Sequence, residues 1–372
     1  MRKYRKESVE KMKIFLVLGT RPQIIKSTPI LHEALKQNLD IQIIHTGQHY
    51  DSSLSQVFFE QLSPPEPFVN LSVGSGSHIY QTAEIMLRLE KYLVLEKPGL
   101  VIVPGDTNSA LAGAIATVKL GIQLAHLESG ARSYDMKMAE EINRRLIDHC
   151  AQTLFAPTNN CKKNLEEEAV TGNIYMVGDT MYDVFKNFSG KADKSTITQK
   201  LDLTNNEYAI LTTHRAENVD DPTRLKKMLQ AIQTLKIPII FPIHPRTKQR
   251  LKENGISLDG TTIRTIDPVG YIEMLALLKN AKIVITDSGG LQKEAFWSKT
   301  PCITIRDRTE WIETVDIGVN FITDVDPAMI KQALKQIQEN YSEIKGRFKT
   351  NPFGNGKASE KIVKILKEKI GS

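Results

Sequence analysis

Residues 283–294 read Ile-Val-Ile-Thr-Asp-Ser-Gly-Gly-Leu-Gln-Lys-Glu, and this stretch decides the fold. An apolar run ends at a polar pair, two glycines follow a serine, and helix-forming residues come next. The pattern predicts a buried strand, a tight turn and the first turn of a helix. The backbone N–H groups at such a helix start can face an anion. An ordinary strand-to-helix turn capped by Asp287 or Ser288 fits the same residues equally well.

The same order of strand, polar turn and helix recurs along the chain. Apolar runs are predicted as strands at 13–18, 41–45, 100–103, 122–127, 152–155 and 174–177, and again at 208–211, 238–243, 262–266, 283–286 and 302–305. Helical patterns such as 78–96 separate them. This alternation predicts an α/β protein with two doubly wound, Rossmann-like domains that face each other across a cleft.

A polar stretch at 187–200 separates the two series of strands and is interpreted as a linker. It divides the chain into an N-terminal domain, residues 1–186, and a C-terminal domain, residues 187–356. The amphipathic segment 357–372 follows a turn at 352–356, and we expect it to pack back on the N-terminal domain. Residues 1–11 precede the first strand and are expected to add little to the fold.

Composition favours an enzyme with an anionic substrate. The 372 residues include 49 Lys and Arg against 43 Asp and Glu, for a formal net charge of +6. The basic residues are scattered and not interleaved with aromatic residues, which argues against nucleic-acid binding. Cys150, Cys161 and Cys302 lack metal-ligand spacing and are expected to be buried thiols. No apolar run has the length of a signal-peptide core or a membrane span, so a cytoplasmic protein with no membrane partner is expected.

Charged residues follow the strands of the first half. Ligands of doubly wound sheets bind beyond the carboxyl ends of the strands, so Asp106 and Glu128 are predicted to point toward one crevice. A helix N-cap is an equally good interpretation of Asp106 taken alone. Arg21 and Lys26 bring positive charge to the same end of the sheet, unless they are solvated surface cations. Glu141, in the first turn of a helix, is interpreted as a partner of the helix dipole.

The second half supplies a different set of groups. His214 follows a strand, the Ser288-Gly289-Gly290 turn is the candidate anion site, and Glu294 lies one helical turn further on, where it can accept from ribose hydroxyls. The motifs GxGxxG after the first strand, GxxxxGK[ST], HExxH and GxSxG are all absent, which argues against common dinucleotide enzymes, P-loop phosphotransferases, zinc proteases and serine hydrolases. A nucleoside-diphosphate sugar would use every group. The turn and the cations would bind its diphosphate, Glu294 would bind its ribose, and the carboxylates would act on its sugar.

Seven motifs in order resemble the non-hydrolysing UDP-N-acetylglucosamine 2-epimerases. They are Gly-Thr-Arg-Pro-Gln-Ile-Ile-Lys (19–26), Thr-Gly-Gln-His-Tyr (46–50), Gly-Asp-Thr (105–107), His-Leu-Glu-Ser-Gly-Ala-Arg (126–132), Glu-Glu-Ile-Asn-Arg (140–144), Thr-His-Arg-Ala-Glu-Asn (213–218) and Thr-Asp-Ser-Gly-Gly-Leu-Gln-Lys-Glu (286–294). The resemblance implies a fold like that of the GT-B glycosyltransferases, a homodimer, and no metal or nicotinamide. It also implies a reaction in cell-surface polysaccharide precursor synthesis: anti elimination of UDP to 2-acetamidoglucal, then re-addition with inversion at C2.

The resemblance also implies roles for individual residues. Asp106, Glu128 and Glu140 become the acid/base carboxylates, and Lys26 and His214 complete the catalytic set. The remaining implied contacts are to UDP: Arg21, Lys26 and His214 hold the diphosphate, Ser288, Gly289 and Gly290 cradle it, and Glu294 binds the ribose.

Two departures from the family pattern bear on the substrate. Trp311 stands where the family usually has an arginine that approaches the ligand, and Gln23 stands where glutamate is common. Both resemble relatives that act on UDP-2,3-diacetamido-2,3-dideoxy-glucuronic acid, so that sugar is the alternative to UDP-N-acetylglucosamine. A hydrolysing epimerase, a GT-B glycosyltransferase and a non-catalytic UDP-sugar sensor are the remaining hypotheses. Tyr50-Asp51 departs from the Arg-Glu pair of enzymes with an activating second UDP-sugar site.

Overall fold

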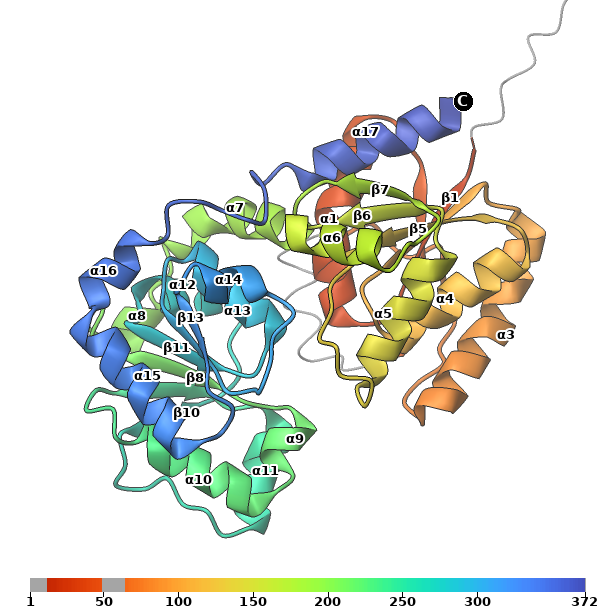
Figure 1. The fold of residues 1–372 in the computed structure, drawn as a ribbon. Helices are drawn as coiled ribbons and strands as arrows, with labels where there is room; N and C mark the ends of the chain where they lie inside the picture. The colour runs from red at the N-terminus through yellow and green to blue at the C-terminus, as the bar shows by residue number, and fades with distance from the viewer. Residues whose placement is uncertain (1–11, 49–63, 372) are drawn as a thin grey trace, which may run out of the picture. The chain divides into compact units, whose positions relative to one another are not determined.

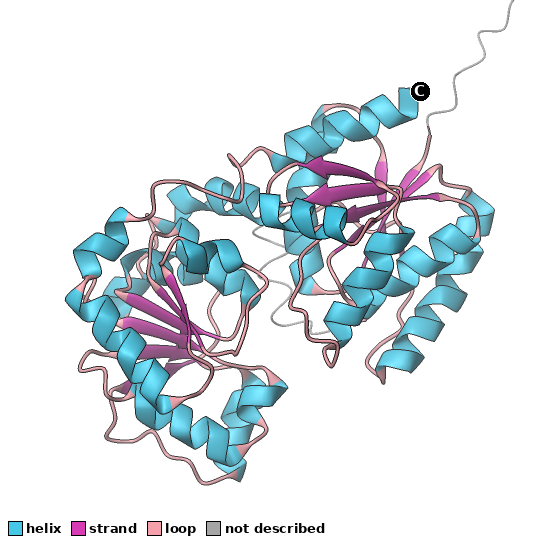
Figure 2. Cartoon of the chain, in the orientation of Figure 1, coloured by secondary structure: helices cyan, strands magenta, loops and turns pink. Residues whose placement is uncertain are grey.

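The computed structural model describes residues 12–48 and 64–371 (Figure 1). The chain divides into two compact units, Met1–Met181 with Lys357–Ser372, and Tyr182–Gly356. Each unit contains one parallel sheet with helices packed around it, as Figure 2 shows. The predicted α/β class with two parallel sheets is confirmed.

The first unit holds a seven-stranded sheet in the order β3-β2-β1-β4-β5-β6-β7. Its strands are β1 (Ile14–Leu18), β2 (Ile41–His45), β3 (Val69–Asn70), β4 (Leu100–Pro104), β5 (Gln123–Leu127), β6 (Thr153–Ala156) and β7 (Asn173–Met176). Every residue of β1 and β4 is buried, because helices cover both faces of a parallel sheet, and this explains their continuous apolar runs. The strand order reverses between β1 and β4, which is where doubly wound sheets bind ligands.

Within the described residues of this unit, six helices surround the sheet. They are α1 (Arg21–Lys36), α3 (His78–Glu96), α4 (Asn108–Lys119), α5 (Ala139–Cys150), α6 (Asn159–Glu167) and α17 (Ala358–Gly371). Helix α4 approaches the sheet closely, since a Cβ at Gly113 would lie 3.0 Å from the Val103 side chain. Helix α17 packs against α1, and its Ile362, Val363 and Leu366 belong to the hydrophobic core of the first unit.

The second unit holds a six-stranded sheet in the order β10-β9-β8-β11-β12-β13, with its reversal between β8 and β11. The strands are β8 (Ala209–Thr212), β9 (Ile239–Pro242), β10 (Ile263–Ile266), β11 (Ile283–Thr286), β12 (Cys302–Thr304) and β13 (Asn320–Ile322). The helices are α8 (Ile197–Lys200), α9 (Ala216–Val219), α10 (Pro222–Ile232), α11 (Pro245–Glu253), α12 (Tyr271–Asn280), α13 (Gly289–Trp297), α14 (Ile312–Asp316), α15 (Pro327–Glu339) and α16 (Tyr341–Gly346).

The segment interpreted as a linker, residues 187–200, is mostly helical. Helix α7 (Thr180–Ala192) runs through its first half, and α8 forms its end. Phe188 is buried and packs edge-on against Tyr271, and Lys279 of α12 donates to the Ser189 hydroxyl at 3.0 Å. The polar composition of this segment therefore comes from the exposed face of a helix anchored to the second unit, and the linker interpretation is wrong.

The three cysteines lie inside the fold to different degrees. Cys161 and Cys302 are buried and Cys150 is half-buried, and burial raises the pKa of Cys302 to about 12.

Within residues 12–48 and 64–371, no helix is long and apolar enough to cross a membrane. Residues 1–11 and Tyr50-Asp51, on which two sequence expectations rest, lie outside the described residues.

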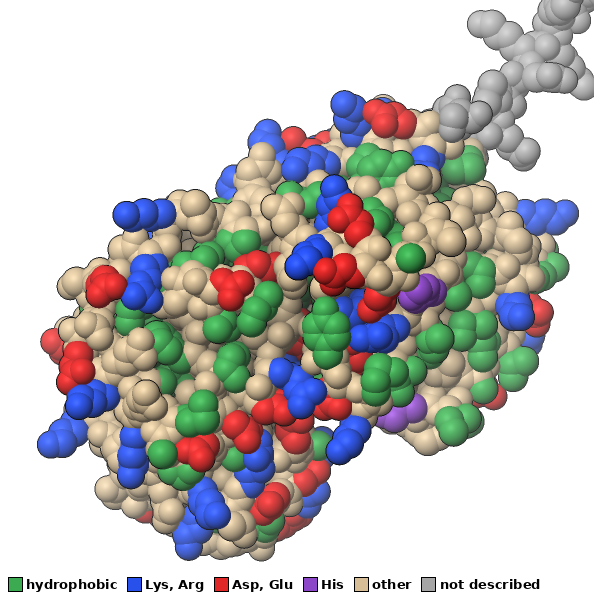
Figure 3. All heavy atoms as spheres, viewed as in Figure 1, with side chains coloured by type: hydrophobic (Ala, Val, Ile, Leu, Met, Phe, Trp, Pro, Cys, Tyr) green, Lys and Arg blue, Asp and Glu red, His purple; other side chains and the backbone are tan. Residues whose placement is uncertain are grey.

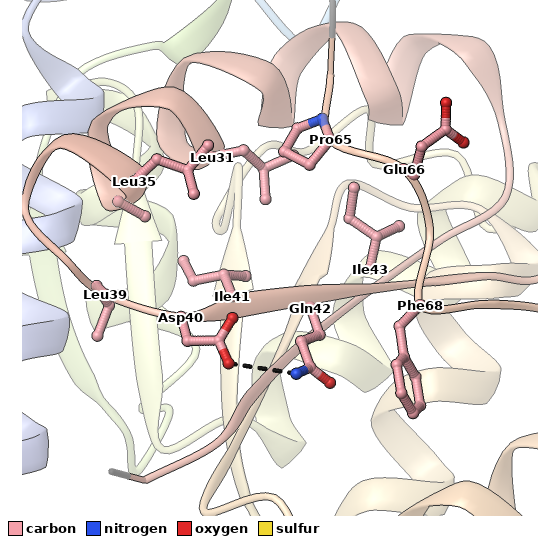
Figure 4. A pocket seen from close by; sticks show the side chains of 11 residues that line it. Leu31, Leu35, Leu39, Asp40, Ile41, Gln42, Ile43, Pro65, Glu66 and Phe68 are labelled. Carbon is pink, nitrogen blue, oxygen red and sulfur yellow. Dashed lines mark hydrogen bonds between the residues drawn. The ribbon is translucent and has the colours of Figure 1, made fainter.

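An apolar pocket of about 270 Å³ opens between α1 and the start of β2 (Figure 4). Leu31 and Leu35 of α1 and Ile41 and Ile43 of β2 line it, and the Gln42 side chain donates to Asp40 at 3.2 Å beside it. The pocket lies at the amino end of its strand, whereas the candidate residues of the sequence follow the carboxyl ends. It is therefore separate from the site described below.

Candidate active site

Gln23 joins the two strand ends at the reversal of the first sheet. Its side-chain oxygen accepts from the backbone N–H groups of Gly19 at 2.8 Å and Thr20 at 3.1 Å, after β1. Its side-chain nitrogen donates to the carbonyl of Pro104 at 2.8 Å, at the end of β4. An ionised glutamate has no N–H to donate to Pro104. The hydrogen bond to Pro104 therefore explains why glutamine suits this position of the chain.

Lys26 and Glu128 form an ion pair beside the end of β4. Both side chains are largely buried, and the lysine ammonium donates to Oε2 of Glu128. Gly105 borders the pair, since a Cβ there would lie 3.1 Å from Nζ of Lys26 and 3.7 Å from Oε2 of Glu128. Glu128 has a φ of +67°, a conformation that is uncommon for a non-glycine residue and is often found at functional sites. The strained backbone aims a carboxylate at the point where β4 and β5 end.

Helix α5 holds the second carboxylate, Asp106. Nη2 of Arg144 lies 2.5 Å from Oδ2 of Asp106, and the Asn143 amide donates to the Asp106 carbonyl at 2.9 Å. Nε of Arg144 also donates to the carbonyl of Glu140 at 3.2 Å, and the Glu140 side chain is exposed at the start of α5. Arg144 thus brings two predicted site residues, Asp106 and Glu140, to one place. The motif 140–144 pointed to this helix, but sequence reasoning assigned no role to Asn143 or Arg144.

Glu141 is more than a partner of the helix dipole. Its side chain is completely buried, and Oε2 accepts from the backbone N–H of Ser133 at 2.8 Å and from its hydroxyl at 3.0 Å. Oε1 accepts from Nε of Arg145 at 3.0 Å. Neighbouring residues of a helix point about 100° apart, so Glu140 faces solvent while Glu141 fixes the loop after β5 to α5. The sequence interpretation of Glu141 was therefore incomplete, because Glu141 lies in the first turn of α5 as expected and also fixes the loop after β5.

Asp287 connects two strand ends at the reversal of the second sheet, as Gln23 does in the first sheet. This buried carboxylate follows β11 and accepts from the Thr213 hydroxyl at 2.8 Å and from the backbone N–H groups of His214 and Arg215, each at 3.0 Å. These residues follow β8, so the contacts bridge the reversal of the sheet. Nδ1 of His214 lies 3.4 Å from Asp287, and the ring is nearly half exposed. Asp287 therefore fixes the turn that presents His214.

The Ser288-Gly289-Gly290 turn begins α13. The Ser288 hydroxyl caps the helix by accepting from the backbone N–H of Leu291 at 3.4 Å, so the cap is Ser288 and not Asp287. Around Gly290 the space is open, with the Ser288 hydroxyl as the nearest atom at 3.9 Å from a Cβ placed there. The first N–H groups of a helix have no acceptor within the helix, and these glycines leave them uncovered. Glu294 is buried one turn further along α13.

Trp311 packs against the same turn. A Cβ at Gly289 would lie 3.4 Å from the indole Nε1 and 3.6 Å from Oε2 of Glu310. The ammonium of Lys293, a buried residue of α13, lies 4.0 Å from the centre of the indole ring. Glu310 in turn accepts from Arg306 at 2.9 Å. The glycine turn therefore meets an indole N–H and a carboxylate, and the ammonium of Lys293 lies against the indole ring.

The predicted residues are thus divided between the two units. In the first, Lys26 meets Glu128, Arg144 links Asp106 to Glu140, and Arg21 begins α1 directly after β1. In the second, His214, the glycine turn and Trp311 gather after β8 and β11. Among the residues that the structure describes, no group of His, Cys, Asp or Glu side chains has the arrangement of a metal site.

Two doubly wound sheets, each with polar side chains and turns at its reversal, define a GT-B-like α/β protein. Comparison with known proteins identifies the particular family. The chain belongs to the UDP-N-acetylglucosamine 2-epimerase family, whose model matches residues 33–367. This confirms the resemblance carried by the seven motifs.

Two relatives of known name and one solved structure illustrate the similarity. The chain is 46% identical to a UDP-N-acetylglucosamine 2-epimerase of Methanocaldococcus jannaschii over 95% of this chain and 99% of the relative. It is 40% identical to a UDP-2,3-diacetamido-2,3-dideoxy-D-glucuronate 2-epimerase of Pseudomonas aeruginosa, with coverages of 95% and 99%. A crystal structure of the M. jannaschii UDP-GlcNAc 2-epimerase in complex with UDP-GlcNAc and UDP matches with a TM-score of 0.86 at 43% identity, covering 96% of this chain and 100% of that one.

Proposed function

We propose that the protein is a non-hydrolysing epimerase that interconverts UDP-N-acetylglucosamine and UDP-N-acetylmannosamine. The observation that carries the proposal is the pair of cation-bound carboxylates, Asp106 with Arg144 and Glu128 with Lys26, which follow the adjacent strands β4 and β5. Inversion at one carbon needs proton-handling groups for both faces of the sugar ring, and two such carboxylates meet that need. Family membership and 46% identity to an enzyme of this name support the substrate.

The proposed reaction proceeds in two balanced steps. In the first, a carboxylate removes the proton from C2, the C1–oxygen bond breaks, and UDP leaves with the bonding electrons to give 2-acetamidoglucal. In the second, a proton is delivered to C2 from the opposite face and UDP adds back at C1. C2–H is weakly acidic, so departure of the stabilised diphosphate, which makes C1 electron-poor, has to lead. Asp106, Glu128 and Glu140 are the proposed acid/base residues.

The two units have different proposed tasks. The first unit, Met1–Met181 with Lys357–Ser372, carries the carboxylates, and the second unit, Tyr182–Gly356, holds UDP. The uncovered N-terminus of α13 suits a diphosphate, because helix N–H groups and the helix dipole both favour anions. The proposed ligands of UDP are the cations Arg21, Lys26 and His214, the turn residues Ser288, Gly289 and Gly290, and Glu294 for the ribose.

Solvent exchange tests the proposal directly. The enzyme is incubated with UDP-N-acetylglucosamine in deuterated water, and the nucleotide sugars are recovered and analysed. The expected result is deuterium at C2 in both UDP-linked epimers. Release of free N-acetylmannosamine and UDP would identify a hydrolysing enzyme instead. Binding of UDP without exchange on either this sugar or UDP-2,3-diacetamido-2,3-dideoxy-glucuronate would identify a non-catalytic sensor.

A second candidate substrate has its own support. Trp311 beside Gly289 and the 40% identity to the Pseudomonas enzyme both favour UDP-2,3-diacetamido-2,3-dideoxy-glucuronate. The chemistry at C1 and C2 is the same for either sugar. Measuring kcat/KM on both purified nucleotide sugars distinguishes the two, and a preference for the uronate would overturn our first choice.

We also propose a homodimer, located in the cytoplasm, in which α3 meets a second copy of the chain. Tyr80, Leu87 and Val94 are exposed by 47, 60 and 54%, and their seven-residue spacing places them on one face of the helix. Figure 3 shows hydrophobic side chains on the surface where Figure 1 places α3. Sedimentation of the Leu87→Lys variant tests the surface, and an unchanged dimer would exclude it.

A further inference from the structure

His126 lies at the centre of a buried polar network in the first unit and has no role in the function proposed above. The residue belongs to β5, and its side chain is completely buried. Nδ1 lies 2.7 Å from Oδ1 of Asp148 on α5, and Nε2 lies 2.8 Å from the carbonyl oxygen of Gly105. Both ring nitrogens therefore contact oxygen atoms.

The nature of these two oxygens fixes the protonation of the ring. A backbone carbonyl can only accept, so Nε2 has to donate to Gly105. An ionised carboxylate can only accept as well, so Nδ1 has to donate to Asp148. Contacts other than that of His126 also favour the ionised form of Asp148, because Nη1 of Arg132 lies 2.8 Å from its Oδ2 and the backbone N–H of Gly130 donates to the same oxygen at 3.0 Å. With both nitrogens donating, the ring carries a positive charge.

The surrounding charges balance this cation. Nη1 of Arg132 lies 2.8 Å from Oδ2 of Asp148, and Arg132 also pairs with Glu168 at 2.7 Å. The network of His126, Arg132, Asp148 and Glu168 then contains two positive and two negative charges, and Arg145 and His149 of α5 also face Glu168, each at 3.5 Å. Buried charges are tolerated when they are paired and hydrogen-bonded, and the buried carboxylate of Asp148 is paired in this way with both His126 and Arg132.

The same network holds the two loops that carry Asp106 and Glu128, two of the three proposed acid/base residues. His126 fixes the carbonyl of Gly105, the residue before Asp106, and Asp148 accepts from the backbone N–H of Gly130 at 3.0 Å, two residues after Glu128. We propose that His126 is an imidazolium, with both ring nitrogens donating, that sets the spacing between Asp106 and Glu128. It is a positioning residue: its contacts are to the protein, and it acts through the two loops. The kinetic part of this inference rests on the proposed function.

Neutron diffraction of the unaltered protein, crystallised at pH 7.5 in deuterated solvent, tests the charge. The expected result is a deuteron on both Nδ1 and Nε2 of His126. A single deuteron, or a deuteron placed on the Asp148 carboxyl, would overturn the proposal. This measurement needs no substrate, so it stands even if the proposed reaction is wrong.

Kinetics of His126→Gln test the positioning, because a glutamine amide is neutral and cannot span both acceptors. We expect kcat, normalised to the number of UDP-binding sites, to fall about 10- to 100-fold, while KM stays within about twofold. His32→Gln is the matched control, because His32 lies on α1 and belongs to none of the contacts of this network. An unchanged kcat in His126→Gln, or an equal loss in both variants, would contradict the role. If His126→Gln does not fold, His126→Asn is measured in the same assay, with the same expected loss of kcat, and the deuteron positions still test the charge.

Discussion

The guanidinium of Arg144 lies 2.5 Å from the carboxylate of Asp106, across 38 residues of sequence. The same side chain donates to the carbonyl of Glu140, so one residue orients both a carboxylate and the start of the helix that carries another. Only a planar side chain with several donors makes both contacts at once.

Replacing Arg144 by lysine should therefore keep the positive charge but lose the simultaneous contacts with Asp106 and the Glu140 carbonyl. We expect kcat to fall about 10- to 100-fold in Arg144→Lys, because an ammonium cannot hold Asp106 and the Glu140 carbonyl together. Steady-state epimerase assays measure the effect. The control is Arg145→Lys, a change at the next, half-exposed residue, and equal activities of the two variants would disprove the positioning role.

The carboxylates themselves can be neutralised with little change of shape. Asp106→Asn and Glu128→Gln should each lower turnover about 10²- to 10⁴-fold, while UDP binding by calorimetry is retained. Glu90→Gln, on the exposed face of α3, serves as the control. Near-normal turnover in either of the first two variants would remove that residue from the acid/base set.

Trp311 places an indole N–H beside the glycine turn. Trp311→Phe keeps a ring on Lys293 and removes only the donor, so KM for the nucleotide sugar should rise about fivefold with little change in kcat. Trp297→Phe is a matched control, because within the described residues the buried Nε1 of Trp297 has no hydrogen-bond partner. An equal KM in both variants and the unaltered enzyme would show that the indole donor does not reach the substrate.

Gln23→Glu should weaken the fold at the reversal of the first sheet. An ionised carboxylate would lose the bond to Pro104 and face its carbonyl oxygen, which should lower the free energy of unfolding by about 1–3 kcal/mol. Urea denaturation at pH 7 measures this. The control is Gln332→Glu, on the exposed face of α15, which should change the free energy of unfolding by less than about 0.5 kcal/mol. A Gln23→Glu variant as stable as the control would show that the bond to Pro104 has no net effect.

Glu168 should contribute stability that depends on pH. The hydrogen bond from Arg132 holds the pKa of Glu168 below its ordinary value of 4.5. Its contribution is then complete above the unfolded pKa and is lost as pH falls through the lower folded pKa. We expect Glu168→Gln to lower the free energy of unfolding by about 1–2 kcal/mol at pH 7 and by progressively less below pH 4.5, measured by urea denaturation across that range. A constant difference at all pH values would contradict this assignment.

Local sequence patterns were sufficient for much of the fold. The predicted strand 41–45 and helix 78–96 coincide with β2 and α3, because a buried parallel strand and a long amphipathic helix each leave a regular pattern. The edge strands β3 and β13, with two and three residues, were too short to leave one. Helix α15 was missed although Asp326-Pro327 is a clear start signal, so that error was avoidable.

The site was only partly predictable for a different reason. Residues at strand ends, such as Asp106 and Glu128, could be found because the carboxyl edge of a parallel sheet is a known location for ligands. Gln23, Arg144 and His126 act through partners 21 to 81 residues away, and no local pattern reveals such contacts. Glu141 shows the same limit, since only the folded loop after β5 distinguishes a buried carboxylate from an exposed one.

The place of α17 in the core of the first unit has a consequence for synthesis of the protein on the ribosome. Ile362, Val363 and Leu366 are translated after all of residues 182–356, yet they complete the core around β1. The second unit has its whole sequence available earlier and can fold first, while the first unit waits with part of its apolar surface uncovered. The first unit, although it begins to leave the ribosome before the second, therefore completes its core only after the second unit has been synthesised.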